Sequence, residues 1–174
     1  GLRHEEVLIK KLKKQGFRIA ELEGKQNEYD YKATKQAMSD GYDFIWQASL
    51  TNNEMRGSAD LLKKVQGCSP FGNWSYQPIE CKLSSSAKTT FLVQACAYCE
   101  LLTPLLGQRP NNFELYLGGG KFKEFAVDKF WAWYQLLRKR YKDFCNSFNP
   151  DIEPNDAPGD HGSWAAFIEE RLEA

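Results

Sequence analysis

The stretch Ser75-Tyr-Gln-Pro-Ile-Glu-Cys-Lys-Leu83 decides the fold, because it is predicted to be a β-strand that carries chemically active side chains near its end. Side chains two residues apart lie on the same face of a strand. Glu80 and Lys82 are therefore expected to lie together, with Cys81 on the opposite face. Pro78 cannot donate to a strand ladder, which predicts an edge strand or a bulge at this position.

The segments around this strand predict a three-stranded meander followed by a helix. Strands are predicted over 42–50 and 58–65, with turn chemistry over 52–57 between them. Ser84 to Ser86 is a candidate cap for a helix over 87–106. The remaining predicted elements are helices over 3–15, 32–40 and 128–146, strands over 17–22, 113–117 and 121–127, and a loop over 67–73. This order predicts an α/β or α+β layered domain in which helices flank a mixed central β-sheet.

The composition is that of a globular domain. The chain has 174 residues, of which 42% are apolar and 26% are charged, which suits one domain with a real core. Lys and Arg total 23 and Asp and Glu total 23, so the net charge is zero. This balance excludes a uniformly basic coat for nucleic acid but leaves room for a local basic patch.

The chain shows no signal for membrane insertion or secretion. No run of 18 apolar residues is present, and no basic segment followed by an apolar one opens the sequence. The five cysteines are an odd number at irregular spacings, which favours reduced thiols and a cytoplasmic location. The chain begins without Met and ends within a helical pattern over 163–173. We therefore expect a fragment of a longer protein, with a core over 1–146 and a linker and C-terminal segment over 147–174.

Two carboxylates and a lysine form the candidate catalytic group. A hairpin can bring Asp60 level with Glu80, which would give two carboxylates for one hard cation. Lys82 could orient or deprotonate an attacking water, or offset charge on a phosphate. The alternatives are an exposed salt pair between Glu80 and Lys82 and a solvated Asp60 near a turn.

Three further residues are candidates on helices. Gln94 and Tyr98 are four residues apart and share a helix face, where ordinary packing with a hydrogen bond is the alternative. His4 is a candidate metal ligand on the first helix, or otherwise a solvated neighbour of Glu5. Glu5 is expected to point elsewhere on that helix, which leaves it as a supporting residue at most.

Together these motifs resemble the PD-(D/E)XK nuclease superfamily, and more narrowly its RecB-like branch with a Gln-x-x-x-Tyr motif. The likeness is carried by an early helical His4, then Gly57-x-Ala-Asp60, Glu80-Cys-Lys82 and Gln94-x-x-x-Tyr98, in this order over about residues 1–145. The resemblance implies a restriction-endonuclease-like core. It also implies a metal-dependent nuclease that hydrolyses DNA phosphodiester bonds, of exonuclease type, in DNA repair, recombination or defence.

The resemblance also implies a role for each site residue. Asp60, Glu80, His4 and the main-chain carbonyl of Cys81 would hold Mg²⁺ or Mn²⁺, with Lys82 as the catalytic lysine. Gln94 and Tyr98 would support the site and contact the nucleic-acid backbone. Some relatives carry an iron–sulfur cluster on four cysteines, but the spacing here does not fit one and none is expected. The cysteines are Cys68, Cys81, Cys96, Cys99 and Cys145.

Two other functions stay open. The chain could be a nucleic-acid-binding module that cuts nothing, or a docking domain of a larger helicase or nuclease protein, with the aromatic helix over 128–146 as its contact face. The basic run 137–142 and scattered lysines could contact phosphates, or could be solvated. DNA, single-stranded or at ends, is the expected partner, with no membrane involved.

Overall fold

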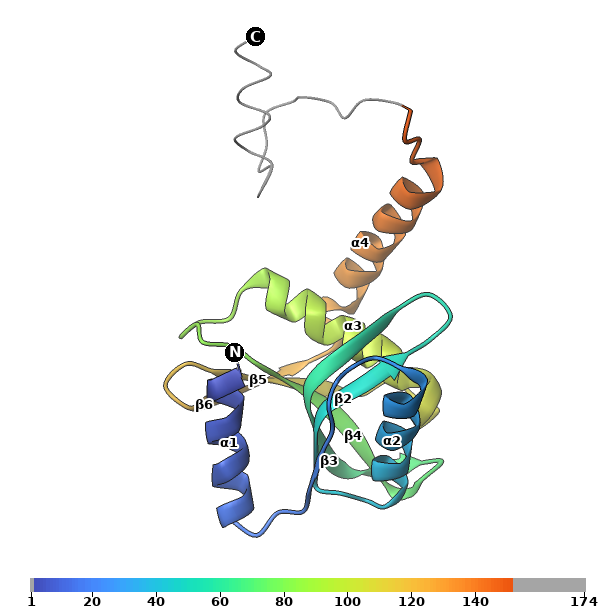
Figure 1. Cartoon of the computed structure of the whole chain (residues 1–174). Helices are drawn as coiled ribbons and strands as arrows, with labels where there is room; N and C mark the ends of the chain where they lie inside the picture. Colours follow the sequence, from blue (N-terminus) through green and yellow to red (C-terminus); the bar gives the residue numbers. More distant parts are fainter. Residues whose placement is uncertain (1, 152–174) are drawn as a thin grey trace. The chain divides into compact units, whose positions relative to one another are not determined.

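The computed structural model describes residues 2–151 (Figure 1). The chain divides into two compact units, residues 1–137 and residues 138–174. The first unit holds the whole β-sheet and every candidate site residue. The predicted domain boundary after residue 146 stays a prediction. Most of the predicted linker and the whole predicted helix over 163–173 lie outside the described residues.

Within residues 2–151, ten elements follow one another in the order α, β, α, β, β, β, α, β, β, α. The helices are α1 (Leu2–Lys14), α2 (Glu28–Ser39), α3 (Thr89–Leu106) and α4 (Asp128–Ser147). The strands are β1 (Ile19–Glu21), β2 (Phe44–Thr51), β3 (Arg56–Ser69), β4 (Gly72–Cys81), β5 (Asn112–Leu117) and β6 (Lys121–Ala126).

The six strands form one mixed sheet in the order β1-β2-β3-β4-β5-β6. Strands β2, β3 and β4 are the predicted antiparallel meander, and β5 and β6 are the predicted hairpin. The pairs β1·β2 and β4·β5 are parallel, and α3 connects β4 to β5. The predicted layered fold with a mixed central sheet flanked by helices is therefore confirmed.

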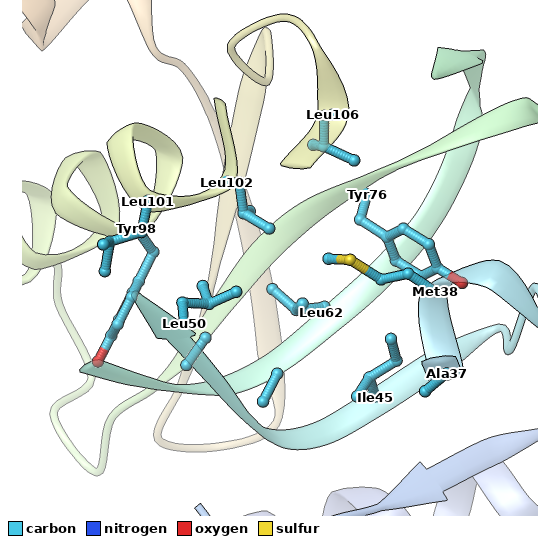
Figure 2. Packing of buried hydrophobic residues seen from close by; sticks show 12 residues of the cluster. Ala37, Met38, Ile45, Leu50, Leu62, Tyr76, Tyr98, Leu101, Leu102 and Leu106 are labelled. Atoms are coloured by element: carbon cyan, nitrogen blue, oxygen red, sulfur yellow. The ribbon is translucent and has the colours of Figure 1, made fainter. Parts of the chain in front are cut away.

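The helices bury the two faces of the sheet in separate clusters. Helix α1 contributes Leu8, Ile9 and Leu12 to a cluster with Leu61 and Ile79. Helices α2 and α3 cover other sheet residues, in a cluster that includes Leu62, Tyr76 and Tyr98 (Figure 2). Since neighbouring residues of a strand point to opposite faces, Leu61 and Leu62 enter different clusters.

The structure corrects three local predictions. The loop predicted over 67–73 is mostly strand, because β3 extends to Ser69 and β4 begins at Gly72. Pro78 lies in a central strand with no register shift. On the side of β4 that faces β5, however, the paired residues begin at Ile79, so Pro78 lies just before the β4–β5 ladder. The N-cap of α3 is Lys88, and its side chain makes no capping hydrogen bond, so the predicted serine cap is wrong.

Among the described residues, α3 is the one helix that is long and apolar enough to cross a membrane by length and composition. Seven of its residues, including Leu102 and Leu106, are buried in this domain. Their packing on the sheet explains the apolar composition of α3, because it is the central helix of the core.

The meander should depend on the α2–α3 side of the core. Replacing the fully buried Leu62 by Ala leaves a cavity, so Leu62→Ala is expected to lower the free energy of unfolding by about 2–5 kcal/mol. Val7 is 62% exposed on α1, and Val7→Ala should change this free energy by less than about 0.5 kcal/mol. Urea unfolding followed by circular dichroism measures both. Equal losses of unfolding free energy in Leu62→Ala and Val7→Ala would contradict the described core.

Candidate functional site

The β3–β4 register brings the two predicted acids together. Leu61 lies opposite Ile79, so the antiparallel pairing carries Asp60 to the level of Glu80. The Glu80 side chain is 1% exposed. One oxygen of Asp60, Oδ2, accepts a hydrogen bond from the main-chain N–H of Cys81 at 2.7 Å. The predicted hairpin geometry for these carboxylates is therefore present.

Lys82 is held between the acid pair and α3. Its Nζ donates to Glu80 Oε1 at 2.5 Å and to Gln94 Oε1 at 3.1 Å. The Gln94 amide in turn donates to the Tyr98 hydroxyl at 3.1 Å, and that hydroxyl donates to the main-chain carbonyl of Ser58 at 2.7 Å. Figure 2 shows the Tyr98 hydroxyl directed away from the other labelled core side chains. A continuous set of hydrogen bonds therefore links the lysine to helix α3 and back to strand β3.

Burial and like charge perturb both acids. Burial, followed by the negative charge of Asp60, raises the pKa of Glu80 to about 8, although Lys82 opposes this shift. Burial also raises the pKa of Asp60, and the charge of Glu5 adds to the shift. The hydrogen bond from the Cys81 N–H acts in the opposite direction. Without a bound cation, this pair therefore retains a proton near neutral pH.

Helix α1 presents two side chains to this end of the sheet. The His4 ring stacks on Tyr116, with ring centroids 4.6 Å apart. Glu5 is 6% exposed, and its Oε2 accepts hydrogen bonds from Trp46 Nε1 at 3.0 Å and Gln47 Nε2 at 2.6 Å. The expectation that Glu5 points elsewhere is wrong, because α1 lies flat on the sheet and both residues of its first turn face inward.

The donor types at this site suit a hard divalent cation, but the side chains are not gathered around one point. His4 Nε2 and Glu80 Oε2 are both buried without a hydrogen-bond partner, and both belong to predicted metal ligands. Buried polar atoms of this kind call for a partner. Within residues 2–151, however, no three His, Cys, Asp or Glu side chains are arranged to hold a metal ion. The donors fit the predicted metal by chemistry.

Three of the five cysteines pack as free thiols in the core, whereas Cys68 and Cys145 are exposed. Cys96 and Cys99 are fully buried in a cluster with residues of α3, β5 and α4. Burial raises the pKa of the Cys81 thiol, which packs in the α1 cluster. The predicted role of the Cys81 carbonyl as a metal ligand stays a prediction.

Some lysines proposed for phosphate contacts have carboxylate partners. Lys63 pairs with Glu114 at 2.7 Å, and Lys64 pairs with Asp43 at 3.0 Å. Lys88 lies 6.0 Å from the centroid of the Phe91 ring, beside the candidate site. Lys88 is therefore better placed to contact a phosphate than Lys63 or Lys64, whose ammonium groups face carboxylates.

No protein-family model matches the chain, and no curated protein matches its sequence. The resemblance to RecB-like nucleases therefore stays a prediction from motifs.

Glu80 should make the metal-free protein less stable at alkaline pH. Its pKa is near 8 in the folded chain and is raised from an ordinary 4.5, so its neutral form favours folding below pH 4.5. That contribution disappears as the pH rises to 8. In EDTA, the free energy of unfolding of Glu80→Gln should therefore rise by a few kcal/mol relative to that of the wild type between pH 5 and pH 8.

Thermal unfolding across this pH range measures the difference. Glu6 is exposed on α1, and Glu6→Gln is the matched control that should follow the wild-type profile. A gap between Glu80→Gln and the wild type that stays constant with pH would contradict the raised pKa.

Proposed function

We propose that this chain is a metal-dependent nuclease domain of the PD-(D/E)XK, RecB-like kind, which hydrolyses DNA phosphodiester bonds. One observation carries the proposal. A pair of carboxylates, with Glu80 fully buried and Asp60 half-buried, meets a lysine that reaches Glu80 at 2.5 Å and is held from the other side by a glutamine. A cytoplasmic role on DNA ends or single strands, alongside a helicase, belongs to the same proposal.

The side chains divide the chemistry between them. Asp60, Glu80 and His4 would hold the divalent cation, Mg²⁺ or Mn²⁺. When bound, the cation supplies Lewis-acid activation of water and charge neutralisation at the phosphate. Lys82 lies within hydrogen-bond distance of Glu80, where an ammonium group can orient a water molecule or offset charge on a non-bridging oxygen. Gln94 and Tyr98 fix the direction of the lysine side chain.

A DNA-binding module that does not cut is the second candidate. It is favoured by one observation, the lack of a gathered group of three metal-donor side chains within residues 2–151. The two candidates differ in whether the acids and Lys82 support turnover in the presence of a divalent cation.

Cleavage should require the cation, the acid and the lysine together. End-labelled single-stranded and double-stranded DNA are incubated with Mn²⁺, Mg²⁺ or EDTA, with RNA of the same sequence in parallel. Asp60→Asn and Lys82→Met keep the side-chain size, and each should lower the rate about 100-fold or more, because each removes a charge at the site of reaction.

Lys32→Ala is the matched control, because Lys32 forms an exposed ion pair with Glu28 on α2. Its rate should equal that of the wild type. Cation-dependent cleavage that survives in Lys82→Met would rule out the assigned site. Binding of DNA without any cleavage by the wild type would favour the non-cutting module.

Tyr98→Phe tests the support of the lysine. The substitution keeps the ring in the core but removes the hydroxyl between Gln94 and Ser58. We expect a cleavage rate about tenfold lower, with the melting temperature lowered by several degrees, because the hydroxyl makes two hydrogen bonds and each contributes about 1 kcal/mol net. A rate equal to the wild type would show that Lys82 is held without Tyr98.

A further inference from the structure

Gln47 has a backbone conformation that is unusual within a strand. It lies in β2 with φ = 56°, in the left-handed region that a residue with a long side chain seldom adopts. Such a conformation costs about 1–3 kcal/mol and persists only where the surroundings enforce it. The strain calls for a compensating role of the side chain.

The strained residue lies level with the acid pair. Its neighbours pair in register with β3, Trp46 with Leu61 and Ala48 with Ala59, so Gln47 lies across from Asp60. The β2–β3 register does not shift here. The ladder omits Gln47 and Asp60 and resumes in the same register at Ala48, so the conformation interrupts the pairing at one position without shifting it.

That side chain joins three elements around the site. Its Nε2 donates to the buried Glu5 of α1 at 2.6 Å, and its Oε1 accepts from the Ser58 hydroxyl of β3 at 3.4 Å. Ser58 also supplies the carbonyl that receives the Tyr98 hydroxyl. One amide group thus bridges the first turn of α1 and the strand that carries Asp60.

The backbone at Gly24 is fitted to the same amide. A Cβ at Gly24 would lie 2.8 Å from Gln47 Oε1 and 2.7 Å from Ser58 Oγ. The segment before α2 therefore covers the amide closely, and any side chain at position 24 would displace it. This close cover helps to hold the left-handed conformation in place.

We propose that Gln47 is a positioning residue that fixes the first turn of α1, and with it His4 and Glu5, against the Asp60–Glu80 pair. Its effect on metal affinity rests on the proposed function, whereas its effect on α1 does not. Trp46 donates to the same Glu5 oxygen from the adjacent position, so two neighbouring residues of β2 hold one carboxylate.

The experiment uses the intact chain and three variants. Gln47→Gly removes the amide but accepts the left-handed backbone without steric cost. Gln47→Glu keeps the length and places a second carboxylate against Glu5. Glu5→Gln combined with Gln47→Glu restores an amide–carboxylate pair with the two roles exchanged.

Gln26→Gly is the matched control. Gln26 is the other left-handed glutamine among the described residues, with φ = 53°. The hydrogen bonds that it makes in the structure use its main-chain N–H and carbonyl, at Ser49 and Tyr31. Its replacement therefore relieves the same kind of strain without touching α1.

Two measurements separate positioning from folding. Hydrogen exchange of the metal-free protein should become about tenfold faster at Leu8, Ile9 and Leu12 of α1 in Gln47→Gly, and should stay unchanged across α3. Titration calorimetry should give Mn²⁺ affinity about tenfold weaker in Gln47→Gly, weaker still in Gln47→Glu, and close to the wild type in the exchanged pair. Gln26→Gly should match the wild type in both measurements.

The outcomes separate this inference from the proposed function. Unchanged exchange in α1 of Gln47→Gly overturns the positioning role, whatever the metal does. A wild type that binds no Mn²⁺ defeats the proposed function, while faster α1 exchange would still support the positioning role. If hydrogen exchange in α1 of the Glu5→Gln and Gln47→Glu double variant is as fast as in Gln47→Glu alone, Gln47 does not act through Glu5.

Discussion

The packing of two carboxylates beside one ammonium group, with Glu80 fully buried and Asp60 half-buried, is the constraint on which this structure depends. Taking these carboxylates out of water is unfavourable, because burial raises the pKa of both. The negative charge of Asp60 further disfavours ionisation of Glu80, and that of Glu5 further disfavours ionisation of Asp60. Lys82 offsets part of that cost through its 2.5 Å contact with Glu80. The remaining elements keep these three groups in place, because the sheet sets their level and the helices exclude solvent.

Regular secondary structure holds the two acids and Lys82 in place. The β3–β4 register, which is unbroken from Leu61 to Gln66, fixes Asp60 against Glu80. On α3, Gln94 accepts a hydrogen bond from Lys82 and is itself bonded to Tyr98. The apolar clusters on the two faces of the sheet contribute favourable free energy, which offsets the unfavourable desolvation of the acid pair. Burial of Leu61 and Leu62 in different clusters places Asp60 on a strand that is packed on both sides.

Much of the fold and the acid pair could be predicted from local patterns. The period of two in strands places Glu80 with Lys82, and helical periodicity joins Gln94 to Tyr98. Glu5 was missed because adjacency in a helix says nothing about how the helix lies on the sheet. The bridge by Gln47 was missed because a left-handed glutamine inside a strand leaves no compositional signal, unlike a left-handed glycine. The length of the β3–β4 hairpin was underestimated because Gly67 and Gly72 resemble loop residues when read alone.

Three separate departures from the rules of stability converge at one end of the sheet. Glu80 has a pKa near 8, His4 Nε2 and Glu80 Oε2 are buried without partners, and Gln47 is left-handed. Each is unfavourable by itself, and each involves a residue of β2, β4 or the first turn of α1. Departures of this kind persist where function requires them and the rest of the fold supplies the compensating stability. Thr34, Arg109 and the left-handed Gln26 show single departures of the same kinds elsewhere. The acid pair is where three kinds meet, which supports the proposed site.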